Sequence, residues 1–227
     1  MDPLVMLGIA AVVIPSITSH EAAHGFVADR LGDPTARSQG RLTLNPIPHI
    51  DPVFTIAIPA FLLLMGSPIL FGGAKPVPVN VRNLGHPRRD WAIVGAAGPL
   101  TNLLLAIAMS LALSVAVHGF GMAGNAPLVE VLAVGIYFNV LLCVFNLLPI
   151  PPLDGSRIFQ MFLSGGALST YQKLEPYGLL VILALVFFVP ATQMLLATLI
   201  VNATLIVTVP FGIEHSLQSG LQNLFHS

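Results

Sequence analysis

The chain is poor in charge, because only 8% of its 227 residues are Asp, Glu, Lys or Arg, whereas an ordinary soluble domain has roughly 25%. Hydrophobic residues make up 55% of the sequence, and the mean hydropathy is +0.86. A soluble fold of this size would leave most of its surface without polar side chains. The composition therefore excludes a soluble globular protein, a disordered chain and a nucleic-acid-binding protein. It predicts a single domain over residues 1–227 that lies in the lipid bilayer.

Cysteine is also scarce, and neither positive nor negative charge is in marked excess. The net charge is −1, so no basic surface would draw the chain to nucleic acid or to anionic lipid. Cys143 is the one cysteine, which excludes an internal disulfide framework and a Cys-rich metal site. The sequence contains no G-x-S-x-G, which argues against a serine intramembrane protease.

The apolar runs predict an all-α polytopic membrane protein with five to six membrane segments. They cover residues 3–27, 53–73, 91–117, 128–148 and 177–209. The last run is longer than the roughly 20 residues of one span, and Pro190 is a candidate point of division. The first run contains His20, Glu21 and His24, which predicts a retained helix rather than the core of a signal peptide.

The basic residues predict how these segments are oriented. They lie on either side of the 53–73 run or after the 128–148 run, and none lies in residues 118–127: Arg30, Arg37, Arg41, Lys75, Arg82, Arg88, Arg89, Arg157 and Lys173. Cytoplasmic connections are enriched in Lys and Arg, so all three basic connections are expected in the cytoplasm. Residues 53–73 must then form a re-entrant segment, the alternative being an ordinary span with one basic connection outside.

Two segments near the membrane surface have their own patterns. Residues 37–45 alternate in polarity, which predicts a short β-like segment. Residues 75–79 are expected to be extended, because Pro76 and Pro78 disfavour helix in the residues before them.

The pattern His20-Glu21-Ala22-Ala23-His24 lies within the first apolar run. On a helix the two histidines are about 40° apart around the axis and about 6 Å apart along it, so both imidazoles reach one metal ion. Glu21 projects about 100° away and is expected to act as a general base, as in metalloproteases. Each ionisable group buried in lipid costs about 2.5–3.5 kcal/mol on insertion scales, and metal binding would offset that cost.

A catalytic zinc site needs a third protein ligand, which the spacing leaves open. Asp154 follows the fourth run after Pro149, Pro151 and Pro152, at a depth that matches the histidines. Its other interpretation is an Asx turn or a helix N-cap. His49 and Asp51 are expected at the same membrane surface and compete for the role, whereas His118 is expected on the far side.

Three motifs occur in the order found in site-2 proteases, a family of intramembrane zinc metalloproteases. They are His20-Glu21-Ala22-Ala23-His24, Gly98-Pro99-Leu100-Thr101-Asn102, and Asn146-Leu147-Leu148-Pro149 followed by Leu153-Asp154-Gly155. Residues 40–52 and 74–80 are similar to the compact prokaryotic branch of that family, which has no PDZ or CBS domain. The resemblance covers about residues 8–177.

The resemblance implies one zinc ion per chain, held by His20, His24 and Asp154, with Glu21 as the base. It implies a catalytic core of about residues 8–160 that cleaves peptide bonds in or near transmembrane segments of membrane-protein substrates. It also implies a multi-pass protein of a prokaryotic plasma membrane, with the active site toward the cytoplasmic side.

Five further residues are candidates for substrate binding: Gly98, Pro99, Asn102, Asn146 and Pro149. Either asparagine would serve equally well as a polar contact between helices. A metal-ion transporter or channel that uses the same buried cluster is the alternative function. It explains buried ligands, but it does not explain a base placed between two of them.

Overall fold

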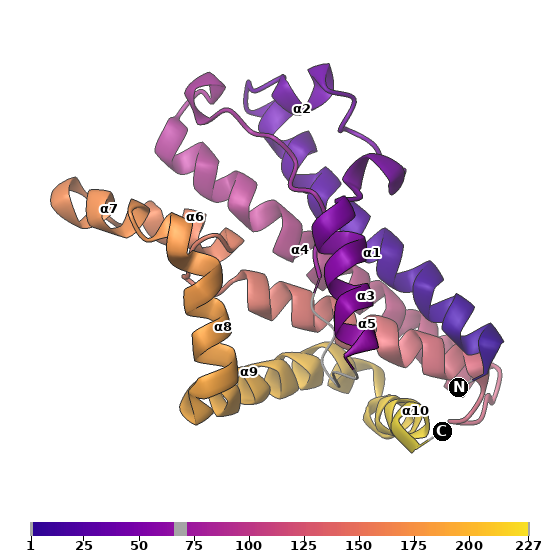
Figure 1. The fold of residues 1–227 in the computed structure, drawn as a ribbon. Helices are drawn as coiled ribbons and strands as arrows, with labels where there is room; N and C mark the ends of the chain where they lie inside the picture. Colours follow the sequence, from indigo (N-terminus) through magenta and orange to yellow (C-terminus); the bar gives the residue numbers. More distant parts are fainter. Residues whose placement is uncertain (1, 66–71, 227) are drawn as a thin grey trace.

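The computed structural model describes residues 2–65 and 72–226, and this part of the chain is helical without any strand. The long helices are α1 (Pro3–Arg30), α4 (Pro87–Ser114), α5 (Pro127–Asn146), α8 (Gly178–Phe188), α9 (Pro190–Thr208) and α10 (Glu214–His226). The short ones are α2 (Thr35–Ser38), α3 (Ile58–Leu64), α6 (Asp154–Gln160) and α7 (Gly165–Gln172). Helices α1, α4 and α5 pack on one another and form the centre of the fold (Figure 1).

Helix α4 begins at the end of the bundle where α1 finishes. The N–H of Gly85 donates a 3.1 Å hydrogen bond to the carbonyl of Leu31. Fully buried Asp33 accepts hydrogen bonds from the backbone of Asn80 and the side chain of Asn83, at 2.6 and 2.8 Å. Burial raises the pKa of the Asp33 carboxyl, but these and neighbouring hydrogen bonds lower it below its usual value. The connection between α1 and α4 therefore leaves and returns at one end of the bundle.

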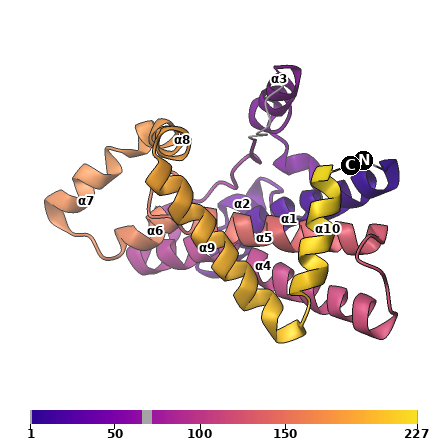
Figure 2. The ribbon, with the colours of Figure 1, turned by 90° about the horizontal axis from the view of Figure 1, so that it is seen from below.

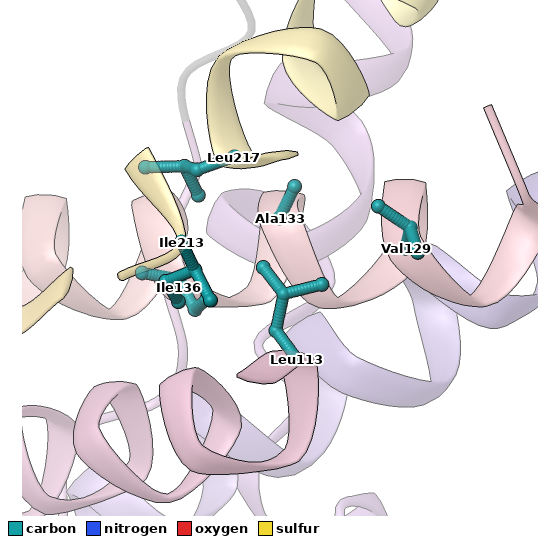
Figure 3. Packing of buried hydrophobic residues seen from close by; sticks show 6 residues of the cluster. All are labelled: Leu113, Val129, Ala133, Ile136, Ile213 and Leu217. Carbon is teal, nitrogen blue, oxygen red and sulfur yellow. The ribbon is translucent and has the colours of Figure 1, made fainter. Parts of the chain in front are cut away.

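The opposite end of the bundle is closed by an apolar cluster. Leu113 of α4 packs with Val129, Ala133 and Ile136 of α5, and Ile213 and Leu217 at the start of α10 cover them (Figure 3). All but Leu217 are fully buried. Removing apolar surface from water contributes about 25 cal/mol per Å², so these contacts stabilise the packing of α10 against the bundle.

Five helical stretches are long and apolar enough to span a membrane, which supports a multi-pass membrane protein. They are Pro3–Arg30, Pro87–Gly119, Pro127–Asn146, Gly165–Phe188 and Pro190–Phe211. The long C-terminal run is divided at Pro190, as the sequence suggested. Helix α4 begins at Pro87 rather than near Trp91, because a proline suits the first position of a helix.

The expected re-entrant segment at 53–73 is not supported. Residues Pro52–Leu64 form one π-helical and one α-helical stretch, and residues 66–71 lie outside the described part. A broken segment inside the membrane needs neighbouring protein to shield its backbone. Helix α3 instead stands away from the bundle (Figure 2), and Phe61 and Leu64 are 61% and 86% exposed.

The expected β-like segment at 37–45 is wrong. Helix α2 occupies residues Thr35–Ser38, and Gly40 then turns the chain with a φ of 65°. Downstream, the hydroxyl of Thr43 accepts a hydrogen bond from the backbone N–H of Asn45, and Asn45 Oδ1 accepts one from the backbone N–H of Ile47. These local side-chain bonds take the backbone donors that a strand would present to a partner.

Candidate metal centre

His20 and His24 lie one turn apart on α1 and face the centre of the bundle. Both are buried, at 6% and 3% exposure. Their rings meet edge to face with centroids 4.8 Å apart, and the two Nε2 atoms are 3.2 Å from each other. The helical spacing of the motif thus brings the two imidazoles to one point, as the sequence predicted.

Asp154, the first residue of α6, completes this group. Its Oδ2 lies 3.0 Å from His20 Nε2 and 3.2 Å from His24 Nε2. Within residues 2–65 and 72–226, this is the one group of three His, Cys, Asp or Glu residues whose ligand atoms could hold a metal ion. Ligands bonded to zinc at about 2.0–2.1 Å with tetrahedral angles lie about 3.3 Å from one another, which matches the observed separations.

The hydrogen bonds behind the two imidazoles indicate which ring nitrogens face the centre. His24 Nδ1 lies 2.7 Å from the carbonyl of Val94, and His20 Nδ1 lies 2.6 Å from Asn102 Oδ1. Both partners are acceptors, so Nδ1 carries the proton in each neutral ring and Nε2 presents a lone pair. Two lone pairs and a carboxylate oxygen then face one another, an arrangement that a cation would stabilise.

The second oxygen of Asp154 is also occupied. Its Oδ1 forms a 3.2 Å ion pair with Arg157, whose guanidinium lies 4.4 Å above the Trp91 ring. Burial raises the pKa of the Asp154 carboxyl, whereas the positive charge of Arg157 lowers it. The ion pair with Arg157 therefore favours the ionised carboxylate, the form that binds metal ions.

Gly98 of α4 is the residue packed against this group. A Cβ at this position would lie 2.5 Å from His24 Nε2 and 2.6 Å from His20 Nε2. Any side chain would occupy the space beside the two nitrogen atoms that converge on Asp154. Gly98 and buried Pro99 lie three turns inside α4.

Glu21 lies beside the cluster and is not part of it. Its Oε2 accepts a 3.0 Å hydrogen bond from the N–H of Val77. Val77 belongs to residues 72–80, which are neither helix nor strand, and the side chain of Arg41 donates to the carbonyl of Lys75 in the same segment at 2.8 Å. The half-buried carboxylate is thus held from one side by backbone.

Asn102 lies behind His20 and is fully buried. Its amide nitrogen donates to Asn139 Oδ1 at 2.8 Å, and the amide nitrogen of Asn139 donates to Ser16 Oγ, also at 2.8 Å. These three residues come from α4, α5 and α1. Their hydrogen bonds connect the three central helices to the imidazole of His20.

The competing ligand candidates lie elsewhere. His49 is buried, but its Nε2 lies 3.0 Å from the carbonyl of Thr43, and neither His49 nor Asp51 belongs to the metal cluster. His118 lies near Gly212, with its Nε2 3.3 Å from that carbonyl. Spacing left the third ligand open, and among the described residues Asp154 is the one whose carboxylate meets the two imidazoles.

The segment between α5 and α6, residues 147–153, is not an extended strand. It turns twice, because the N–H of Ile150 donates to the carbonyl of Leu148 and that of Leu153 donates to the carbonyl of Ile150. Asn146 donates to the carbonyl of Leu142 on its own helix. The carbonyl of Pro149 accepts from the Tyr171 hydroxyl.

Sequence reasoning missed three residues that support the site. Arg157 was a recognisable candidate, because Asp and Arg three residues apart on a helix are neighbours. No sequence pattern could identify Val94, because it contributes its backbone carbonyl, which every residue has. Asn139 lies 37 residues from Asn102, and no local pattern connects the two.

Comparison with known proteins shows which protein family the chain resembles. The family model described as Peptidase family M50 matches residues 111–189, which include Asp154 but not the two histidines. The chain is 44% identical over 177 residues to the Bacillus subtilis protein named "Putative zinc metalloprotease YwhC", covering 76% of this chain and 77% of that one. It is 31% identical over 187 residues to "Putative zinc metalloprotease Rip2" of Mycolicibacterium smegmatis, covering 81% and 69%. No solved structure matches the chain significantly.

Proposed function

The chain belongs to peptidase family M50, the site-2 protease family, and on this basis we propose that it is a zinc metalloprotease that cleaves peptide bonds in or near the transmembrane segments of membrane proteins. The two relatives are named as zinc metalloproteases, which supports zinc as the metal. The proposed enzyme is one domain with a catalytic core of about residues 8–160.

The observation that carries this proposal is the convergence of His20, His24 and Asp154, whose ligand atoms lie within 4.8 Å of one another. We assign these three residues as the zinc ligands. Three protein ligands leave a position open, which is the pattern of catalytic rather than structural zinc. Gly98 supports this assignment, because any Cβ there would collide with the Nε2 atoms of His20 and His24.

Glu21 is the proposed general base. Zinc, when bound, supplies a Lewis acid to the scissile carbonyl and to the attacking water. The Glu21 carboxylate takes a proton from that water and delivers it to the leaving amine. The N–H of Val77 restrains the carboxylate at Oε2. The lone pairs of His20 and His24 stay directed at the metal because Asn102 and Val94 accept from their Nδ1 atoms.

The candidate substrate-binding residues divide into two groups. Asn146 and Pro149, where α5 ends, are proposed to contact the unwound substrate, and both are at least partly exposed. Gly98, Pro99 and Asn102 are buried in α4. We propose that they shape the site and that Asn102 orients His20. Buried Pro99 and Asn102 are not proposed to contact the substrate directly.

The proposed location is a prokaryotic plasma membrane, with the site toward the cytoplasmic side. The metal cluster lies between α1, α4 and α6, and Gly95 of α4 packs closely on α6 near Asp154. The end of the bundle that holds this cluster also carries the basic connections around residues 30–41, 75–89 and 157–173. The positive-inside bias places such an end in the cytoplasm.

Glu21→Gln tests the proposed function, because it keeps the side-chain volume and removes the base. Purified wild-type and variant proteins are incubated in detergent with a single-span substrate that has a helix-destabilising residue in its membrane segment. A general base contributes typically 10²–10⁴-fold, so cleavage should fall by that range. Zinc content should not change, because Glu21 lies outside the cluster.

Glu130→Gln is the matched control, since Glu130 lies in the first turn of α5, at the other end of that helix from the site. It should cleave as the wild type does, and a chelator should abolish cleavage until zinc is restored. Full cleavage by Glu21→Gln would contradict the mechanism. Zinc flux through proteoliposomes, with no substrate cleaved by any variant, would instead favour the transporter.

A further inference from the structure

The polar residues behind His20 form a chain of hydrogen bonds in which each residue donates to the next one away from the imidazole. His20 Nδ1 lies 2.6 Å from Asn102 Oδ1, and Asn102 Nδ2 donates to Asn139 Oδ1 at 2.8 Å. Asn139 Nδ2 donates to Ser16 Oγ at 2.8 Å, and Ser16 Oγ donates to the carbonyl of Val12 at 2.7 Å. Asn102 and Asn139 are fully buried, and Ser16 is 1% exposed.

The carbonyl of Gly135 determines the direction of this chain. It lies 2.9 Å from Asn139 Nδ2, and a carbonyl can only accept. The amide group of Asn139 must therefore point its nitrogen toward Gly135, which leaves its oxygen facing Asn102. Both N–H groups of Asn139 are then used, one by Gly135 and one by Ser16.

The orientation of Asn102 follows from that of Asn139. Its nitrogen donates to Asn139 Oδ1 and, at 3.4 Å, to the carbonyl of Ser16. Reversing the amide of Asn102 would place its oxygen against both of these acceptors. An unsatisfied buried polar group costs more than a satisfied one contributes, so the reversed arrangement is disfavoured. The oxygen of Asn102 is left facing His20, where it requires a proton on Nδ1.

We propose that Asn139 is a positioning residue for the metal centre, which acts through Asn102 to hold His20 in the tautomer that presents Nε2 to zinc. This inference rests on the proposed role of His20 as a zinc ligand. Asn139 does not touch the metal cluster. It determines which end of the Asn102 amide faces the imidazole, and a direct partner of a ligating imidazole, as Asn102 is here, typically accounts for 10- to 100-fold in metal affinity.

The test measures zinc binding directly, without using cleavage. The zinc dissociation constant of purified full-length protein is determined by competition with a chromophoric chelator. Asn139→Leu, close to asparagine in size, removes the acceptor for Asn102 and should weaken zinc binding roughly 10-fold. Asn139→Asp keeps an acceptor for Asn102 but loses the amide donors to Gly135 and Ser16, so its zinc affinity should lie between that of the wild type and that of Asn139→Leu. Asn139→Ala carries the same expectation as the leucine variant and replaces it if that variant does not fold.

A double-mutant cycle separates this role from a general loss of packing. Asn102→Leu should weaken zinc binding by itself, and Asn139→Leu should then add nothing, because its effect passes through Asn102. Ser110→Ala is the matched control. Ser110 is fully buried on α4 and bonds to the carbonyl of Ala106 on its own helix, so its loss should leave zinc affinity unchanged.

The tautomer itself is read by nitrogen NMR of protein labelled at histidine, with the His20 signals assigned by His20→Gln. Metal-free wild type should show a proton on Nδ1 of His20, and metal-free Asn139→Leu should show that signal weakened or split. Unchanged zinc affinity and an unchanged Nδ1 signal in a folded Asn139→Leu would overturn the inference, as would additive effects in the cycle. Full zinc affinity in His20→Gln would overturn the proposed ligand set instead.

Discussion

The backbone N–H of Val77 donates a 3.0 Å hydrogen bond to Glu21 Oε2, across 56 residues of sequence. Val77 lies between two prolines, in a segment that has no regular secondary structure. Arg41 donates to the carbonyl of Lys75 in the same segment, and the N–H of Lys75 donates to the carbonyl of His49. The connection between α1 and α4 is therefore hydrogen-bonded to Glu21, the residue proposed as the general base.

Val77→Pro removes that donor and should slow cleavage. Proline has no N–H, and Val77 already lies between two prolines in a segment without regular structure. A hydrogen bond to a charged group contributes about 1.5–3 kcal/mol, so the rate should fall roughly 10- to 100-fold at unchanged zinc content. Val77→Ala keeps the N–H and is the control for lost packing. A wild-type rate in Val77→Pro would mean that the bond does not orient Glu21 during catalysis.

Asp154→Ala should lose zinc, whereas His49→Ala should keep it. The wild type is expected to hold about one zinc per chain, measured by elemental analysis of the purified protein. Removing a ligand should weaken binding beyond the 10- to 100-fold typical of residues that only support ligands. His49 lies outside the cluster, with its Nε2 near the carbonyl of Thr43. The reverse pattern, with zinc lost in His49→Ala only, would show that the third ligand is misassigned.

Gly98→Ala should impair the site while the helix remains intact. The added Cβ would lie 2.5 Å from His24 Nε2, so at least one imidazole must move. Misplacement of catalytic groups by about 1 Å can cost on the order of 10²-fold in rate, and cleavage should fall by about that factor. Gly166→Ala is the control, because a Cβ there meets nothing within 4 Å. Equal rates in the two variants would argue that the space beside Gly98 is not used.

The local part of the site was predictable from sequence, and the long-range part was not. His20 and His24 follow from the four-residue repeat of a helix, which requires no knowledge of the fold. Asp154 lies 134 residues from His20, so spacing left it in competition with His49 and Asp51 until the family resemblance was used. Asn139 had no signal, because its role depends on where α5 packs against α4.

The fold, too, was predictable from sequence only in part. Hydropathy located α1, α4, α5 and the pair divided at Pro190, since lipid requires long apolar helices. It failed at residues 37–45, where Thr43 and Asn45 bond to nearby backbone and the apparent alternation is a consequence of turns. The basic residues on both sides of the 53–73 run suggested re-entry, but helix α3 of that run stands away from the bundle (Figure 2). In both cases a local pattern was interpreted without knowing what lies beside the segment.

Cysteine labelling should place Arg37, Arg82 and Lys173 on the cytoplasmic side and Asn125 outside. Single cysteines at these exposed positions, in a Cys143→Ala background, are treated in intact cells with a reagent that does not cross membranes. The hydrogen bond between Gly85 and Leu31 requires the labels at 37 and 82 to behave alike, whichever way the protein is inserted. Opposite behaviour of these two would contradict the packing of α1 on α4. Protection of the Asn125 label, with the other three modified from outside, would keep the fold and reverse the orientation derived from the basic residues.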